Sequence, residues 1–223
     1  ATDEVYIERL GKLPYVIDMP FNSIVKSNIE MYIRKRDLVE RMLGMSLYYL
    51  PIFEAALDKE GLPEELKYLP VIESALNPYA KSPAKAVGLW QFMRPTAKGL
   101  GLEINSLIDE RRDPLRSSDM GAKYLKQLYE MYNDWSLAIA AYNCGPGNVN
   151  KAIIRAGGSP KDYDGSFWDV YAGLPRETRS YVPLFMGATY AFAYHEAHGI
   201  KYATPAMPLA VDTIMITRPL HLE

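Results

Sequence analysis

Most of this chain is predicted to be helical, and the fold class that follows is all-α. Apolar side chains recur every three or four residues through 22–59, 117–132 and 176–198, which is the spacing of one face of a helix. Glycine and proline pairs separate the helical stretches, and only 209–217 has the pattern of an extended segment. Hydrophobic residues make up 48% and charged residues 23%, as in ordinary globular proteins.

The first helical stretch, 22–59, contains Pro51, where we expect a kink or a restart because proline cannot donate an intrahelical hydrogen bond. Gly61 ends this stretch. Pro63, followed by two glutamates, begins another helix, since proline suits the first turn and acidic side chains complement the helix dipole there. That helix is expected to end close to Glu73.

Turn signals divide the remainder of the chain. Asn77-Pro78 and Ser82-Pro83 mark a loop, Gly145-Pro146-Gly147 separates two helices, and Gly199 ends the last one. The helices expected in this half lie at 117–132, 135–143, 147–156 and about 176–198.

The predicted organisation has three parts. Residues 1–60 form an N-terminal helical arm that packs on a compact domain of residues 61–200, and residues 201–223 form an extended tail. No internal repeat is evident, and we expect a monomer.

Composition excludes several classes of function. The net charge of −2 provides no general attraction for nucleic acid. One cysteine, Cys144, and three histidines make a zinc cluster improbable, and the apolar runs are too short to span a membrane. We therefore expect neither a metal nor a cofactor.

Glu73 is the most informative residue, because no other Asp or Glu occurs from position 74 through 102. A carboxyl group among apolar residues resists ionisation, and a neutral acid near pH 7 can protonate a glycosidic oxygen. The alternative is an exposed Glu at a helix end near Lys67 or Lys81, and composition alone favours it because most glutamates are solvated.

A glycosidase usually needs a second carboxylate, and the sequence around Glu73 offers none. The next acids lie in Asp109-Glu110-Arg111-Arg112-Asp113-Pro114, which is predicted to be a turn held by Arg–carboxylate pairs. Without a second carboxylate, the substrate's own hydroxyl or N-acetyl group would have to attack its anomeric carbon.

Other candidates have ordinary structural alternatives. Gln91 suits hydrogen bonding to a sugar in a groove wall, or it is a surface residue. Tyr142 and Asn143 offer a hydroxyl and an amide beside a sharp turn, although Tyr142 could be a core aromatic. Cys144 with His195 and Asn143 could mimic a thiol protease, but none of the local signatures of such enzymes is present.

Four ordered blocks together resemble the lytic transglycosylases of the soluble-Slt type, most closely the branch of membrane-bound transglycosylase D. The resemblance covers about residues 40 to 195. The first block, 69–74, includes Ile72-Glu73-Ser74, and the second, 86–97 with 109–114, includes Gly88-Leu89-Trp90-Gln91-Phe92-Met93. The third, 135–143, includes Ala141-Tyr142-Asn143, and the fourth, 177–182, includes Glu177-Thr178-Arg179-Ser180-Tyr181.

The resemblance implies a lysozyme-like fold and non-hydrolytic cleavage of the MurNAc–GlcNAc β-1,4 bond of peptidoglycan, which leaves 1,6-anhydroMurNAc ends. Glu73 matches the single residue that acts first as acid and then as base, and Ser74 matches a structural hydroxyl. The positions that match glycan-binding or groove-lining residues of the family are Ser82, Gln91, Met93, Tyr142, Asn143 and Tyr181.

The family also implies a partner and a location. The partner is the glycan strand of peptidoglycan, and the location is the periplasm, with outer-membrane anchoring through an N-terminal lipid. Residues 209–223 are expected to lead to C-terminal LysM modules, and Cys144 replaces the usual Ala of its block. Hydrolysis by a muramidase of goose-lysozyme type, or glycan binding without catalysis, are the alternatives.

Overall fold

The computed structural model describes residues 1–204, and these are organised as helices. The β structure in this part of the chain is restricted to isolated bridges at Lys81–Val87, Val87–Phe92 and Ile104–Asp109. The all-α prediction is therefore confirmed, whereas the extended segment expected at 209–217 lies outside the described residues. The elements are α1 (Asp3–Gly11), α2 (Ser23–Arg34), α3 (Arg36–Glu60), η1 (Glu64–Tyr68), α4 (Leu69–Ser74), α5 (Arg94–Gly99), η2 (Glu110–Arg112), α6 (Pro114–Tyr132), α7 (Trp135–Cys144), α8 (Pro146–Arg155), α9 (Phe167–Val170), η3 (Tyr171–Gly173), α10 (Arg176–Ala193) and η4 (Glu196–His198).

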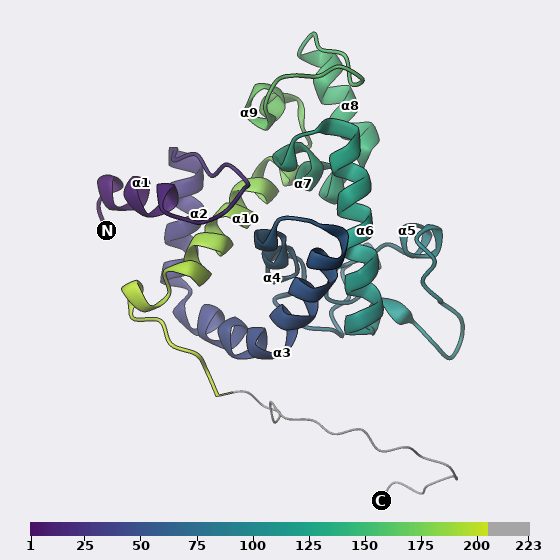
Figure 1. Cartoon of the computed structure of the whole chain (residues 1–223), viewed down its shortest axis with the longest axis horizontal. Helices are drawn as coiled ribbons and strands as arrows, with labels where there is room; N and C mark the ends of the chain where they lie inside the picture. Colours follow the sequence, from purple (N-terminus) through teal and green to yellow (C-terminus); the bar gives the residue numbers. More distant parts are fainter. Residues whose placement is uncertain (205–223) are drawn as a thin grey trace, which may run out of the picture.

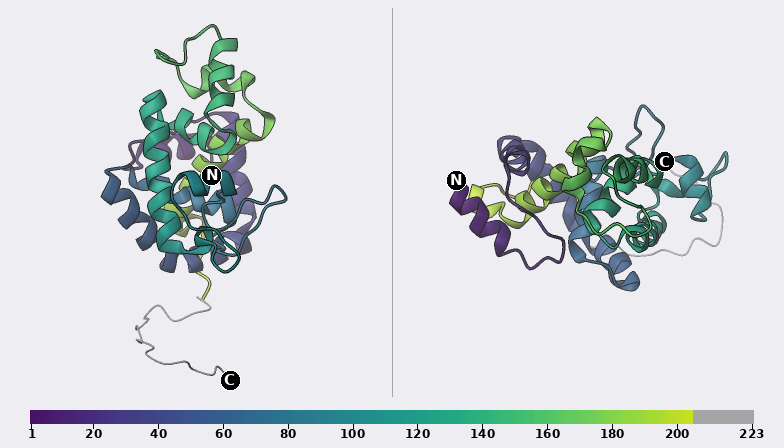
Figure 2. Two further views of the ribbon diagram at one scale, coloured as in Figure 1. Left: turned by 90° about the vertical axis from the view of Figure 1, so that its right-hand side faces the viewer. Right: turned by 90° about the horizontal axis from the view of Figure 1, so that it is seen from above.

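The short helix α4 lies among longer helices (Figure 1). Helix α10 packs along α2 and also contacts α7 and α4, while α6 packs on both α3 and α7. Figure 2, seen from above, places α1 and the α5 region at opposite ends of the molecule. This arrangement holds α4 against α10 near the middle of the fold.

Side-chain caps fix where several helices begin. Asn22 accepts hydrogen bonds from the N–H groups of Ile24 and Val25 at the start of α2. Asp113 caps α6, where Pro114 occupies the first turn, and Asp134 caps α7. These caps end the preceding loops at defined residues and so fix the positions of the helices that border the site.

Of the two outcomes expected at Pro51, a restart of the helix is wrong, and a kink stays a prediction. Helix α3 continues through Pro51, and the chain instead leaves the helical conformation at Lys35, where ψ is 49°. A proline removes one helical hydrogen bond, but its φ fits a helix, and burial of Tyr49 and Phe53 on either side stabilises the turn. The helix expected at 176–198 also ends earlier, at Ala193, and continues only as the short η4.

Trp90 anchors the loop after α4 in the core. Its ring is fully buried, meets Phe53 edge to face with centroids 5.4 Å apart, and donates from Nε1 to the Ser118 hydroxyl at 3.0 Å. Gly121 on α6 permits this position, because a Cβ there would lie 2.6 Å from the indole ring. The loop that carries Gln91 is thereby fixed to α3 and α6.

The segment 109–114 forms the turn predicted for it. The Arg111 guanidinium makes two hydrogen bonds to the Asp109 carboxylate, at 2.8 and 2.7 Å, and a third to the Phe92 carbonyl. The Arg111 backbone also packs directly on Gly88, whose φ of 87° and close contact leave no room for a Cβ. This turn therefore braces the loop of residues 80–92.

The N-terminal residues pack closely on the rest of the chain. The buried Glu65 carboxylate accepts the N–H groups of Val16 and Ile17 at 2.6 and 2.7 Å, and Gly187 of α10 lies against the backbone of Asn28 on α2. The division into a 1–60 arm and a 61–200 domain stays a prediction. Within residues 1–204, no helix is both long and apolar enough to cross a bilayer.

Candidate active-site groove

Glu73 occupies the next-to-last position of α4, and the backbone turns sharply just after it. Ala75 and Leu76 both adopt left-handed conformations, with φ of 50° and 61°, and Leu76 is completely buried. The Ser74 hydroxyl lies 3.0 Å from the carbonyl oxygens of Pro70 and Leu89, which ties α4 to the Trp90 loop. The predicted structural role of Ser74 agrees with these contacts.

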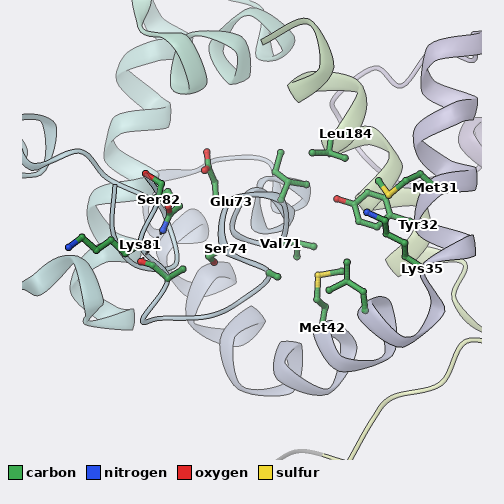
Figure 3. Close-up of a pocket in the computed structure, with 15 residues that line it drawn as sticks. Met31, Tyr32, Lys35, Met42, Val71, Glu73, Ser74, Lys81, Ser82 and Leu184 are labelled. Atoms are coloured by element: carbon green, nitrogen blue, oxygen red, sulfur yellow. Dashed lines mark hydrogen bonds between the residues drawn. The ribbon is translucent and has the colours of Figure 1, made fainter. Parts of the chain in front are cut away.

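Two cavities meet at Glu73. One, the α2-side pocket, has a volume of about 470 Å³ and extends toward Tyr32, Met42 and Leu184 (Figure 3). The other, the α7-side pocket, has a volume of about 460 Å³ and extends toward Met93 and Tyr142. Glu73, Ser82 and Gln91 line both, so the two pockets form a continuous groove with the acid at its centre.

Burial raises the pKa of Glu73 to about 7. The Tyr181 hydroxyl donates a hydrogen bond to the Glu73 carboxyl, which favours the ionised form and opposes that shift. The negative charge of Glu177, which lines the α7-side pocket, raises the pKa further. Glu73 is therefore substantially protonated near neutral pH, as the sequence predicted.

The alternative for Glu73 was an exposed position at a helix end near Lys67 or Lys81, and within residues 1–204 neither lysine pairs with it. Lys67 is buried and contacts the Glu54 carboxylate at 2.7 Å and Glu64 as well. Lys81 lines the α2-side pocket, yet its side chain extends away from Glu73 in Figure 3. The interpretation of Glu73 as a solvated surface residue is wrong.

Tyr142 faces the α7-side pocket from α7 and is fixed by its own hydroxyl. That hydroxyl donates to the Trp90 carbonyl at 2.7 Å, and the ring packs among Phe92 and Tyr124. Tyr142 thus packs like a core aromatic and also lines the pocket, while its role in binding a substrate stays a prediction. Its ring forms one wall of the pocket beside the acid.

Gln91 and Ser82 are held by the loop in which they lie. Gln91 has a φ of 50°, and its amide nitrogen donates to the Gly88 carbonyl at 2.7 Å. Ser82 Oγ accepts the Ala86 N–H at 3.0 Å. Within residues 1–204 the side-chain amide oxygen of Gln91 and the hydroxyl proton of Ser82 make no hydrogen bond, so a ligand in the groove can use them. Met93, 43% exposed, lies on the α7-side wall.

Asn143 and Cys144 end α7 inside the same pocket. Asn143 Oδ1 accepts from the buried Thr178 hydroxyl at 2.8 Å, which orients the side-chain amide. Burial raises the pKa of the Cys144 thiol, the opposite of what a nucleophilic cysteine needs. His195 instead contacts the Ile200 carbonyl at 2.9 Å and does not line the groove, so the thiol-protease set is not assembled.

The fold gathers every predicted site residue at this groove. Tyr181 contacts Glu73, and the other six line the walls of the groove. These six are Glu73, Ser82, Gln91, Met93, Tyr142 and Asn143. The sequence interpretation missed Glu177, although it precedes Tyr181 by one helical turn and so shares its helix face. It also missed Tyr32 and Lys35, which no local pattern connects to Glu73.

Within residues 1–204, no group of three His, Cys, Asp or Glu side chains is arranged to hold a metal ion. Around Glu73 and along the α7-side pocket, the chemistry available is that of one protonated carboxyl group, one further carboxylate, and neutral hydrogen-bonding side chains, whereas Lys35 and Lys81 line the α2-side pocket. This set suits proton transfer to an uncharged polymer.

Comparison with known proteins gives consistent matches. Residues 51–164 match the family described as Transglycosylase SLT domain. The chain is 29% identical over 205 residues to membrane-bound lytic murein transglycosylase D of Escherichia coli strain K12, covering 92% of this chain and 44% of that protein. It is 39% identical over 95 residues to membrane-bound lytic murein transglycosylase F of Pseudoalteromonas translucida, covering 38% of this chain and 19% of that protein.

Solved structures agree on the fold. The 70-kDa soluble lytic transglycosylase of E. coli superimposes with a TM-score of 0.55 at 24% identity, over 81% of this chain and 32% of that one. A 70-kDa soluble lytic transglycosylase in complex with bulgecin A gives a TM-score of 0.54 at 26% identity, over 72% and 26%. The lysozyme-like fold class implied by the sequence is thus established. Since the matched family domain spans more than half of the chain and contains Glu73, the chain belongs to the transglycosylase SLT domain family.

Proposed function

We propose that this chain is a peptidoglycan lytic transglycosylase that cleaves the MurNAc–GlcNAc β-1,4 bond without water. The observation that carries the proposal is Glu73, a carboxyl group with a pKa of about 7 at the centre of a continuous groove. A general acid works best when its pKa lies near the working pH. The SLT family membership and the relatives named as lytic murein transglycosylases support the same reaction.

In the first step Glu73 donates its proton to the glycosidic oxygen, and the bond from that oxygen to C1 of MurNAc breaks. The leaving sugar takes the proton and the bonding electrons, which leaves positive charge on C1 and a carboxylate on Glu73. The Tyr181 hydroxyl already donates to that carboxyl, so it stabilises the anion as it forms.

In the second step the same carboxylate accepts the proton of the C6 hydroxyl of MurNAc. The C6 oxygen forms a bond to C1, which closes the 1,6-anhydro ring and returns Glu73 to its neutral form. No water is consumed, and one residue serves as acid and then as base. The neutral polar residues of the groove, Ser82, Gln91 and Asn143, would bind sugar hydroxyl and acetamido groups, with Met93 and Tyr142 as walls.

Hydrolysis is the second candidate, and one observation favours it. Glu177 lines the α7-side pocket together with Glu73, so the groove contains two carboxyl groups although the sequence near Glu73 offered one. A carboxylate in that position could activate a water molecule, as in inverting glycosidases.

Mass spectrometry of digested peptidoglycan distinguishes the candidates. We expect products that end in 1,6-anhydroMurNAc, and their absence from a Glu73→Gln digest. Reducing MurNAc ends would show hydrolysis, and a wild type that binds glycan without turnover would show a binding protein.

We further propose that the chain acts on the cell wall in the periplasm, as a monomer. Its relatives are named as membrane-bound, which supports an anchored protein at the outer membrane. This chain covers 44% of the length of the E. coli relative, so anchoring is a proposal about the whole protein. Membrane fractionation of cells expressing the full-length gene tests it.

A further inference from the structure

The two halves of the groove differ in chemistry. The α7-side pocket presents hydroxyl and amide groups together with the Glu177 carboxylate, and no cationic side chain from the described part of the chain lines it. The α2-side pocket is lined mainly by apolar side chains, including Met31, Met42 and Leu184. Sugars favour the first kind of wall, because their hydroxyl groups need hydrogen-bonding partners, whereas the second kind suits small apolar groups.

The α2-side pocket also carries positive charge. Lys35, at the turn between α2 and α3, lines it, and Figure 3 shows this side chain reaching back over Tyr32 toward the pocket. Within the described residues Lys35 makes no ion pair. Apart from Glu73, which is substantially protonated near pH 7, no carboxylate of residues 1–204 lines this pocket.

The positive charge continues along α3. A third cavity of about 440 Å³ adjoins the α2-side pocket, shares Leu38 and Met42 with it, and is lined by Arg41. Arg41, like Lys35, is exposed and forms no ion pair within residues 1–204. An apolar channel with two cations, Lys35 and Arg41, that form no ion pair within residues 1–204 thus complements a ligand that is partly apolar and negatively charged.

The substrate that we propose contains such a group. Each MurNAc of peptidoglycan carries a lactyl ether to which a short peptide is attached, and the free carboxylates of this peptide give it a net negative charge. We propose that the α2-side pocket binds this acidic peptide substituent, with Lys35 as the residue that recognises its carboxylates. The inference rests on the proposed function, and it assigns a substrate contact to α2 and α3 residues that precede the family match at 51–164. Repulsion by Glu177 disfavours the peptide on the opposite side.

The test compares glycan strands that carry their peptides with the same strands after an amidase has removed them. For Lys35→Gln we expect kcat/KM to fall about threefold on peptide-bearing strands, as is usual for one exposed charge pair. Lys35→Glu should lower it further, by about tenfold, because it adds repulsion. Neither variant should change kcat/KM on peptide-free strands by as much as twofold.

Arg34→Gln is the matched control, because Arg34 is adjacent, exposed and outside the pocket, where it pairs with Glu30 at 3.8 Å. We expect it to change neither rate. Equal losses on both substrates for the Lys35 variants, or the same loss in Arg34→Gln, would overturn the inference.

A binding experiment separates this inference from the proposed reaction. In a Glu73→Gln background, isothermal titration measures the affinity for a GlcNAc–MurNAc disaccharide with and without its peptide. Tighter binding of the peptide form that depends on Lys35 supports the inference even if the wild type shows no turnover. Turnover to anhydro products without that dependence keeps the proposed function and contradicts the inference.

Discussion

The Tyr181 hydroxyl donates a hydrogen bond to the Glu73 carboxyl across 108 positions of sequence. Tyr181 lies on α10, and only 7% of its surface is exposed. Its hydroxyl therefore has little access to solvent as an alternative hydrogen-bond partner. The bond orients one oxygen of Glu73 and stabilises the ionised form, while burial favours the protonated form. The balance of these two effects places the pKa of Glu73 at about 7 and underlies the following predictions.

Wild-type kcat/KM should fall as pH rises through about 7, because the free enzyme needs Glu73 protonated. In Tyr181→Phe the hydrogen bond that lowers the pKa of Glu73 is lost, so the fall in kcat/KM, which is the alkaline limb of the pH profile, should move to higher pH. A pH profile of turnover on peptide-free glycan measures the shift. A limb that moves to lower pH would contradict the role given to Tyr181.

Glu177→Gln should move the same limb in the opposite direction. Its charge raises the pKa of Glu73, so its removal lets Glu73 ionise at lower pH. Analysis of the digestion products of this variant gives a second test. Continued release of anhydro ends is expected, since Glu177 has no step in the proposed mechanism, whereas loss of turnover at every pH would favour the hydrolytic candidate.

Glu73→Gln should stabilise the protein above neutral pH. The pKa rises from 4.5 to about 7 on folding, so between these values the unfolded carboxyl is ionised while the native one keeps its proton. Rising pH therefore favours the unfolded state of the wild type, by up to about 3 kcal/mol at 1.36 kcal/mol per pH unit. A glutamine side chain does not ionise, so the variant avoids this loss of stability.

Urea unfolding at pH 4 and pH 8 measures this difference. The two proteins should have similar free energies of unfolding at pH 4, and the variant should be the more stable at pH 8. Glu196→Gln, at an exposed position of η4, controls for the loss of one charge. A stability difference that is the same at both pH values would be inconsistent with a raised pKa.

Gly121→Ala should destabilise the fold by about 1 to 3 kcal/mol, because its Cβ would lie 2.6 Å from the Trp90 ring and would overpack the core. Gly147→Ala in α8 is the matched control, since within residues 1–204 a Cβ there would meet nothing within 4 Å beyond its own stretch of helix, and it should stabilise by up to about 1 kcal/mol. Thermal unfolding of both variants checks the pair. Equal effects would mean that helix propensity, not contact with Trp90, governs position 121.

Ala75→Gly should raise the free energy of unfolding by about 1 kcal/mol. Ala75 has a φ of 50°, a conformation in which a Cβ is strained and glycine is not. Ala55→Gly, at an exposed position inside α3, should instead destabilise by about 0.5 to 1 kcal/mol. Urea denaturation of both variants tests the sign, and destabilisation by Ala75→Gly would show that the turn after Glu73 is not strained.

Local sequence signals predicted much of the fold. Helical spacing identified the central part of α6, and the Gly145-Pro146-Gly147 turn separated α7 from α8. The break at Lys35 had no such signal, because apolar residues at helical spacing lie on both sides of it. The short α1, α5 and α9 were not anticipated, since short helices depend on tertiary packing more than on propensity.

The sequence by itself determined that the protein is all-α, that Glu73 stands apart from other acids in its own segment, and which family it joins. Only the tertiary structure decided that Glu73 is half-buried with a pKa near 7, that Glu177 enters its pocket, and that α2 and α3 extend the groove. The physical reason is that helix formation depends on neighbours a few residues apart. Desolvation, charge and cavity shape depend instead on side chains such as Lys35 and Tyr181, which only packing brings close to Glu73.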